Sequence, residues 1–188
     1  MPDTQARQVK QIRKSAEQAG SYLEALDTAA QGGQPDEEKR LVDTQEYMQQ
    51  LEELALPFAT AAGCVLQVQN SVPAQLFIEV QNVQRALLNI IENAVRYSPK
   101  GGTVQVVLQS GPQGSAEFIV RDQGLGFAPE ALAHATEPFW RQDTAWGADG
   151  HYGLGLAIAA EIAQRHGGAL QIGNLPQGGG EVRLILPQ

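Results

Sequence analysis

Apolar residues recur at steps of three and four positions over residues 5–30, with polar and charged residues between them. This spacing is a heptad pattern, and it predicts a helix with a narrow apolar seam. A single helix cannot bury such a seam, so we expect a partner helix in a hairpin, a dimer or both. The alternative is a helix that lies flat on its own domain. The seam consists of Val9, Ile12, Ala16, Ala19, Leu23 and Leu26.

Residues 31–39 interrupt this pattern with Gly, Pro and charged residues. That composition is typical of a linker. We therefore predict two units. Residues 1–40 form a dimerisation-type helix with its linker, and residues 41–188 form a larger domain.

In the larger unit, Asp43 and Glu46 form a capping-box pattern that predicts the start of a second helix. Pro57 is expected to kink this helix or loosen its end. Short apolar runs at residues 64–69 and 76–80 predict two strands. The apolar face predicted for the helix consists of Tyr47, Leu51, Leu54 and Phe58.

A third helix is predicted to end at Ser98-Pro99, and residues 103–109 and 117–121 predict a β-hairpin. Pro129 suits the first turn of a short helix. Residues 136–152 predict a long loop, of the kind that often serves as a mobile lid. The core side of the third helix is predicted to consist of Val83, Leu87, Ile90, Ile91 and Ala94. The remaining predicted elements are a helix at 154–166 and strands at 169–172 and 182–186.

Composition narrows the class of protein. The chain has 188 residues, a formal net charge of −8 and a single cysteine, Cys64. The acidic balance argues against nucleic acid or an anionic membrane as the main partner. Cys64 has no second cysteine to pair with, which favours a reducing compartment. No apolar run approaches the ~20 residues of a membrane span, and no signal peptide is visible, so we expect a cytoplasmic chain without membrane contact.

The third helix carries four polar residues on the face opposite its core side, at i, i+4, i+7 and i+8: Asn89, Asn93, Arg96 and Tyr97. Carboxamides are poor helix formers, so two of them one turn apart suggest a ligand. Amide oxygens suit a hard cation such as Mg²⁺, Arg suits phosphate, and Tyr can cover a flat ring. The alternative is the polar outer face of an ordinary amphipathic helix.

Two glycine motifs point to the same kind of ligand. Asp122-x-Gly124-x-Gly126 follows a strand, where a carboxylate can accept from an exocyclic amine such as that of adenine. Gly153-Leu-Gly-Leu156 opens a helix and offers free N–H groups to phosphate. By itself, the first motif is more simply a glycine turn with a capping Asp, and the second is weak evidence.

The order of these motifs resembles the ATP-binding domain of sensor histidine kinases. The resemblance covers residues 42–188 and implies an α+β fold of the Bergerat type, shared with gyrase and mismatch-repair ATPases. This fold is a two-layer α/β sandwich with a mixed sheet and helices on one face. Residues 5–30 resemble, more loosely, the second helix of the family's dimerisation hairpin, so an N-terminal helix should precede it. The family's N, G1, F, G2 and G3 boxes would be Asn89-x-x-x-Asn93, Asp122-x-Gly-x-Gly126, Glu137-Pro-Phe139-Trp-Arg141, Gly153-Leu-Gly-Leu156 and Gly178-Gly-Gly180.

The resemblance implies a role for each motif in binding ATP and Mg²⁺. Asn93 would ligate Mg²⁺, and Asn89 would help to hold metal or phosphate. Asp122 would accept a hydrogen bond from the adenine amine, and Phe139 would anchor the lid. The other implied contacts are phosphate binding by Arg96 and Arg141, cover of adenine or ribose by Tyr97, a base pocket lined by Gly124 and Gly126, and phosphate binding along Gly153, Leu154, Gly155 and Leu156.

Three features depart from the family's pattern. None of His134, His151 and His166 lies in the His-x-x-x-Thr-Pro-like context of the phosphoacceptor. His166 is instead expected to cap a helix. His151-Tyr152 stands where the family usually has Gly-Thr or similar, which disfavours a phosphate contact there. The G3 box is short of its usual pattern and is interpreted as a turn.

The resemblance also bears on the reaction. ATPases of the superfamily place a Glu general base where this chain has Asn89, which cannot take a proton at neutral pH. This difference favours phosphoryl transfer, in which Asn89, Arg96 and Arg141 would position and neutralise the phosphates. Glu92 is a candidate helper base.

The expected function is that of a Mg·ATP-binding catalytic domain that donates the γ-phosphoryl group to a histidine outside this chain. The chain is then expected to be a fragment that begins after the phosphoacceptor helix. Expected partners are that helix, a response regulator receiver domain and a second copy in the full-length protein. The expected location is the cytoplasm, and the chain is either a cytosolic protein or the cytoplasmic part of a membrane-bound sensor. Two alternatives are a degenerate ATP-binding regulatory module and an anti-sigma-type serine kinase.

Overall fold

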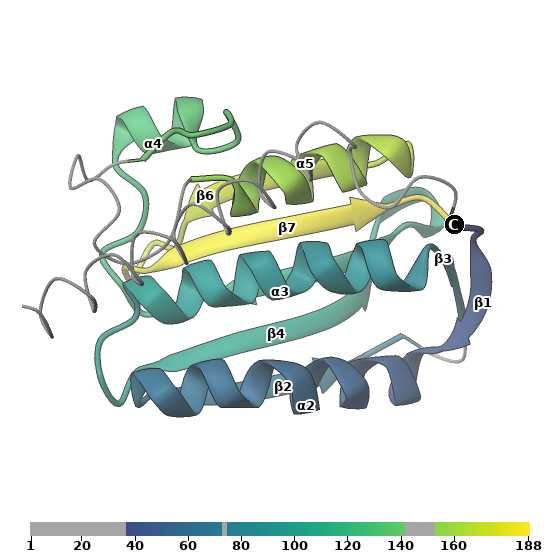
Figure 1. The fold of residues 1–188 in the computed structure, drawn as a ribbon, viewed down its shortest axis with the longest axis horizontal. Helices are drawn as coiled ribbons and strands as arrows, with labels where there is room; N and C mark the ends of the chain where they lie inside the picture. The colour runs from purple at the N-terminus through teal and green to yellow at the C-terminus, as the bar shows by residue number, and fades with distance from the viewer. Residues whose placement is uncertain (1–36, 73–74, 142–152) are drawn as a thin grey trace, which may run out of the picture.

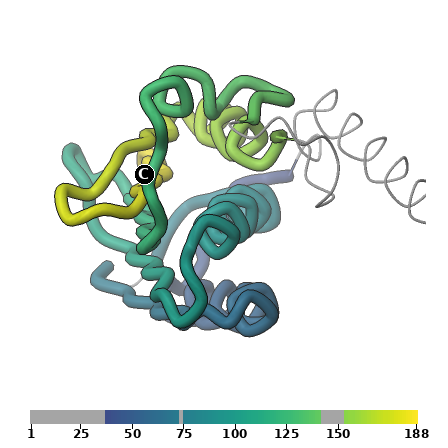
Figure 2. The backbone as a smooth tube through the Cα atoms, turned by 90° about the vertical axis from the view of Figure 1, so that its left-hand side faces the viewer, coloured from purple at the N-terminus to yellow at the C-terminus, as the bar shows by residue number. Residues whose placement is uncertain are grey.

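Helices with one apolar face and strands with alternating apolar residues pack here into two layers (Figures 1 and 2). The computed structural model describes residues 37–72, 75–141 and 153–188. The heptad helix predicted over residues 5–30 therefore lies outside the described residues. In the described part, no helix is both long enough and apolar enough to span a membrane.

The larger sheet of the described residues contains β2 (Val65–Asn70), β4 (Thr103–Ser110), β5 (Ala116–Arg121), β6 (Ala169–Asn174) and β7 (Gly180–Leu186). The strand order across the sheet is β2-β4-β5-β7-β6. β2 runs parallel to β4, and the other neighbouring pairs are antiparallel, so the sheet is mixed as predicted. β4 and β5 form the predicted hairpin around the short turn η1 (Pro112–Gly114).

The helices α2 (Thr44–Ala62), α3 (Val80–Tyr97) and α5 (Gly155–Arg165) cover one face of this sheet (Figure 2). The short helix α4 (Pro129–His134) begins at the predicted proline. All five residues predicted on the core side of α3 are buried. The predicted two-layer α+β fold, with a mixed sheet and helices on one face, is thus confirmed.

The apolar face predicted for α2 is half right. Tyr47 and Leu51 are buried. Leu54 and Phe58, in contrast, are 45% and 40% exposed, so placing them in the core was wrong. A helix with about 3.6 residues per turn places the i+3 and i+4 positions on either side of the same face, and packing buries the i+4 side, so the buried stripe continues from Leu51 in steps of four residues. The other buried apolar residues of this helix are Met48, Ala55 and Ala59.

The predicted cap of α2 is present. The Asp43 side chain accepts hydrogen bonds from two backbone N–H groups of the first turn, at 2.9 and 3.0 Å. The helix continues through Pro57 and stops only at Gly63, which adopts a left-handed φ of 70°. Pro57 therefore does not end the helix.

The sequence pattern did not indicate the strand β1 (Arg40–Asp43), which pairs antiparallel with β3 (Gln75–Ile78). Four residues beside a linker are too few to show a strand period. Just before β1, the Glu37 carboxylate accepts from the backbone N–H groups of Gln81 and Asn82 at 2.8 and 2.9 Å, in the first turn of α3. Glu37 thus packs on the larger unit, and a domain boundary near residue 40 stays a prediction.

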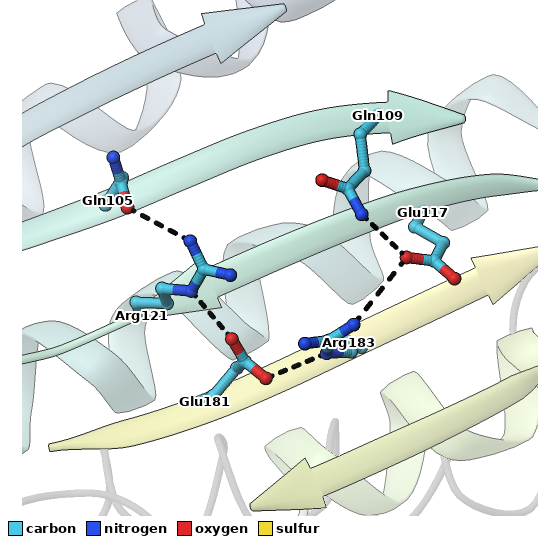
Figure 3. A network of polar contacts seen from close by, with 6 residues as sticks. All are labelled: Gln105, Gln109, Glu117, Arg121, Glu181 and Arg183. Atoms are coloured by element: carbon cyan, nitrogen blue, oxygen red, sulfur yellow. Dashed lines mark hydrogen bonds and ion pairs between the residues drawn. The ribbon is translucent and has the colours of Figure 1, made fainter. Parts of the chain in front are cut away.

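The face of the sheet away from the helices carries a network of charged and amide side chains (Figure 3). Arg121 donates to one oxygen of Glu181 at 2.6 Å, and Arg183 donates to its other oxygen at 2.8 Å. Arg183 also lies 3.8 Å from a carboxylate oxygen of Glu117. These charges compensate one another across β5 and β7, and the amides on β4 extend the network to a third strand. The network consists of Gln105, Gln109, Glu117, Arg121, Glu181 and Arg183.

We expect this network to make stability depend on pH. Burial alone would raise the pKa of the Glu181 carboxyl, but the hydrogen bonds and charges of Arg183 and Arg121 outweigh it, so the pKa lies below its ordinary value of 4.5. A carboxyl with a lowered pKa stabilises the fold above its unfolded-state pKa, and this stabilisation is lost as the pH falls through the folded-state value. Glu181→Gln should therefore lower the free energy of unfolding by about 1 kcal/mol at pH 7.

Urea unfolding at pH 7 and at pH 3.5 measures this effect. The difference between Glu181→Gln and the unmodified chain should shrink at the lower pH. Glu130→Gln is the matched control, because the Glu130 side chain lies exposed on α4. A difference that stays constant between the two pH values would contradict this role of the Glu181 charge.

Candidate nucleotide-binding site

The predicted motifs gather at one end of the two layers, on the left in Figure 1. The end of β5, the C-terminal half of α3, the beginning of α5 and the turn between β6 and β7 all meet there. Four of the five motifs, the N, G1, G2 and G3 boxes, which are far apart in the sequence, therefore meet at one end of the structure.

The C-terminal half of α3 presents the predicted polar face. Asn89 and Asn93 are half-buried, whereas Arg96 and Tyr97 are exposed. The amide nitrogen of Asn89 is buried and has no hydrogen-bond partner among the described residues. A buried donor without a partner costs roughly 1–3 kcal/mol, so Asn89 marks a place where a ligand acceptor fits.

The beginning of α5 lies directly over Asn89. A Cβ atom built on Gly155 would lie 3.5 Å from the Cβ of Asn89, so the two backbones approach closely. The N-cap residue of α5, Leu154, forms no side-chain cap hydrogen bond, and no other described side chain is seen to cap this end. Its first N–H groups and the positive end of its dipole therefore face the region of the unpartnered amide. The side chains of Leu154 and Leu156 are buried, which leaves only their backbone for a ligand.

Asp122 is 8% exposed and follows directly on β5. Its Oδ1 accepts from the backbone N–H groups of Gly124 at 2.8 Å and Gly180 at 3.1 Å. Among the described residues, no donor contacts Oδ2 of this carboxylate, which leaves an acceptor for a ligand. The G3 box therefore does more than turn the chain, because Gly180 holds the Asp122 side chain.

Gly124 joins this loop to α3. A Cβ atom at Gly124 would lie 2.3 Å from the backbone oxygen of Tyr97, which only a glycine can tolerate. The predicted base-pocket glycine thus sets the distance between the G1 box and the C-terminal end of α3. Gly126 is on the far side of the loop and adopts a left-handed φ of 75°.

Glu92, the candidate helper base, is half-buried on α3. Burial raises the pKa of its carboxyl, and the nearby charge of Arg96 only partly opposes this rise. A raised pKa brings a carboxyl closer to the range in which it can accept and release a proton at neutral pH.

The described ends of the predicted lid loop lie side by side. The N–H of Phe139 donates to the backbone oxygen of Gly153 at 3.1 Å. Phe139 is 43% exposed and has a left-handed φ of 68°, an unusual conformation for a bulky residue. A Cβ atom at Gly153 would lie 3.0 Å from Cγ of Arg141, so the stem of that side chain lies against the hinge. His151-Tyr152 lies outside the described residues.

The described histidines have structural partners. His166 caps α5 as predicted and is 5% exposed. Its Nδ1 lies 2.8 Å from the backbone oxygen of Ile162, and its Nε2 accepts from the N–H of Glu79 at 3.3 Å. His134 is exposed, contacts Glu137 at 2.8 Å and stacks on Trp140.

Sequence reasoning missed one residue beside the site. Asn174 ends β6, and its side chain forms two hydrogen bonds with the backbone of Phe127. The only signal in the sequence was an Asn ahead of a glycine-rich turn, a common turn composition. The sequence pattern also predicted Gly180 as part of a turn, whereas the structure shows that Gly180 is the first residue of β7.

Comparison with known proteins agrees with this geometry. Residues 79–188 match the family model described as histidine kinase-, DNA gyrase B- and HSP90-like ATPase. The chain therefore belongs to this family. Within it, the chain carries an ATP-binding catalytic domain of the type found in two-component sensor histidine kinases. The resemblance inferred from the order of the motifs is confirmed.

Two curated relatives illustrate the similarity. The sensor histidine kinase SpaK of Bacillus subtilis is 44% identical over 110 residues, which are 58% of this chain and 24% of SpaK. The histidine-protein kinase/phosphatase MprB of Mycolicibacterium smegmatis is 42% identical over 119 residues, which are 60% of this chain and 24% of that protein. The chain thus spans about a quarter of the length of these relatives.

Solved structures show the same fold. Full-length ShkA in complex with AMPPNP superimposes with a TM-score of 0.81 at 28% identity, covering 98% of this chain and 39% of ShkA. A mycobacterial sensor histidine kinase MprB structure gives a TM-score of 0.68 at 29% identity, covering 79% of this chain and 97% of that chain.

Proposed function

We propose that this chain binds Mg·ATP at the end of α3 and donates the γ-phosphoryl group to a histidine outside the chain. The observation that carries the proposal is the buried amide nitrogen of Asn89, which has no partner among the described residues and lies beneath the N-terminus of α5, where Leu154 provides no side-chain cap. A buried amide donor and a helix N-terminus together suit a phosphate oxygen. The complex of ShkA with AMPPNP supports the proposal, because ShkA shares the fold.

The base end of the ligand would lie between α3 and the G1 box. Asp122 would accept from the adenine amine through its Oδ2, since Oδ1 is already bonded. Tyr97, exposed at the end of α3, would cover the adenine or ribose. Gly124 and Gly126 would line the base pocket, where the lack of a Cβ lets a flat ring approach the backbone.

The phosphate end would lie at the beginning of α5. Asn89 would donate to a phosphate oxygen, and Arg96 and Arg141 would neutralise phosphate charge. Phe139 would anchor the lid over the phosphates. The backbone of four residues would add N–H groups: Gly153, Leu154, Gly155 and Leu156.

The residues present fit a shared Mg²⁺ site. Among the described residues, no group of three or more His, Cys, Asp or Glu side chains could hold a metal. Asn93, half-buried one turn after Asn89, would offer its amide oxygen to Mg²⁺, and phosphate oxygens and water would complete the coordination, which is a common arrangement for this ion. Bound Mg²⁺ would supply charge neutralisation at the phosphates.

Transfer to a protein acceptor fits this site better than hydrolysis. Asn89 occupies the place of the general base of the related ATPases and cannot take a proton. Glu92 would assist as a base, and its raised pKa supports that role. Phosphoryl transfer depends mainly on positioning and charge neutralisation, which the described groups can provide.

The proposed partners are the phosphoacceptor helix, a response regulator receiver domain and a second copy of the full-length protein. The apolar seam from Val9 to Leu26 would support the dimer. We propose a cytoplasmic location, because the single cysteine suits a reducing compartment.

A transfer assay tests the proposal. The chain is incubated with ATP labelled at the γ-phosphate and with a two-helix hairpin that carries a phosphoacceptor histidine. We expect a labelled hairpin whose phosphate is acid-labile and alkali-stable, as in a phosphoramidate. The isolated chain should label itself weakly and turn over ATP well below ~1 per second, the low end of typical enzymes. Asn93→Ala should abolish the labelling without unfolding the chain, because Ala is a good helix residue.

The other outcomes separate the alternatives. ATP binding without transfer to the hairpin would favour a degenerate regulatory module. An acid-stable, alkali-labile product would indicate a serine kinase. Strong labelling of the isolated chain on His134, His151 or His166 would contradict an acceptor outside the chain.

A further inference from the structure

Asn174, the last residue of β6, holds the second half of the G1 loop. Its Oδ1 accepts from the N–H of Phe127 at 2.7 Å, and its Nδ2 donates to the backbone oxygen of Phe127 at 2.8 Å. The side chain thus pairs with a backbone residue as a neighbouring strand would. Only a carboxamide carries one donor and one acceptor on a flat group of this size.

The loop that Asn174 holds has little regular structure of its own. Residues 122–128 belong to no helix or strand. Leu125, at the tip of the loop, is fully exposed. The first part of the loop is fixed by the bonds of Asp122 with Gly124 and Gly180, but these bonds do not reach the second glycine. The second half of the loop depends on Asn174.

Asn174 is also fitted closely to Gly126. A Cβ atom at Gly126 would lie 2.5 Å from Oδ1 of Asn174, and Gly126 has a left-handed φ of 75°. The glycine of the G1 box is therefore needed not only for a ligand but also for the approach of this amide. Phe127, which follows, packs partly into the core near Gly180.

We propose that Asn174 is a positioning residue for the base pocket. By fixing Gly126 and Phe127, it sets the shape of the loop whose first residue, Asp122, presents its free oxygen to the base. The side-chain hydrogen bonds of Asn174 go to the backbone of Phe127, so it would act on the base through the loop. The inference rests on the proposed function, because it assumes that the G1 loop binds the base of ATP.

Asn174→Leu and Asn174→Asp test the proposal. Leu keeps the approximate shape and removes both hydrogen bonds, whereas Asp keeps the acceptor and places a second oxygen against the backbone oxygen of Phe127. We expect both variants to bind ATP about 5- to 30-fold more weakly, the effect of one or two lost hydrogen bonds. Discrimination between ATP and GTP should fall as well. Gln177→Leu is the control, since the Gln177 side chain is exposed in the adjoining turn.

Calorimetry with ATP and GTP and amide hydrogen exchange without nucleotide give independent readouts. Exchange of the amides of residues 124–127 should be faster in Asn174→Leu and unchanged in Gln177→Leu. If the unmodified chain binds ATP, but Asn174→Leu keeps the same affinity and ATP/GTP ratio, the positioning role is overturned alone. If the unmodified chain binds no ATP, the proposed function fails together with this role. Loss of affinity with unchanged selectivity and unchanged exchange would also overturn the role.

Should Asn174→Leu fail to fold, the same measurements on Asn174→Asp decide the question. This variant retains one of the two hydrogen bonds. Its melting temperature should stay close to that of Gln177→Leu while its ATP affinity falls. Unchanged affinity in a folded Asn174→Asp would reject the role.

Discussion

Asp122→Asn should weaken ATP binding by about 5- to 100-fold and shift the base preference toward GTP. Oδ1 of Asp122 accepts from two backbone N–H groups, so an Asn at this position must keep its oxygen there. Its amide nitrogen then replaces Oδ2. A free acceptor becomes a donor, which opposes the amino group of adenine and matches the carbonyl oxygen of guanine.

Calorimetric titration of both proteins with ATP and with GTP measures this change. Glu130→Gln provides the control for loss of one negative charge, because Glu130 lies exposed on α4. Its affinities should equal those of the unmodified chain. An Asp122→Asn protein with unchanged ATP/GTP selectivity would remove Asp122 from the base pocket.

Gly124→Ala adds only one methyl group, but it should cause a large loss of ATP affinity. The added Cβ atom would lie 2.3 Å from the backbone oxygen of Tyr97 and 2.9 Å from Oδ1 of Asp122. The Tyr97 oxygen belongs to the backbone of α3, so this clash can be relieved only by moving the G1 loop away from α3. We expect the affinity for ATP to fall at least ~30-fold, the factor that corresponds to about 2 kcal/mol.

Gly173→Ala is the matched control on β6, where nothing lies within 4 Å of an added Cβ atom. It adds the same methyl group and should leave ATP binding unchanged. Circular dichroism and thermal melting show whether Gly124→Ala retains the fold of the larger unit. A folded Gly124→Ala protein that binds ATP normally would refute the close contact between the G1 loop and α3 as a requirement of the site.

The sequence by itself determined much of this protein. The 3.6-residue period of α3 identified its buried side and its polar face before any contact was known, because helix faces depend on local spacing alone. The capping residue Asp43, the hairpin of β4 and β5 and the start of α4 at Pro129 are also local signals. Five motifs in a fixed order then indicated the family.

Only the tertiary structure decided which groups meet. Leu54 and Phe58 are exposed because the position of the sheet, rather than the pattern of α2, selects the buried stripe. β1 forms because β3 offers it an edge more than 30 residues away along the chain. The bonds of Asp122 with Gly180 and of Asn174 with Phe127 join residues 58 and 47 positions apart. Such contacts depend on how the layers pack, and no local pattern of residues encodes them.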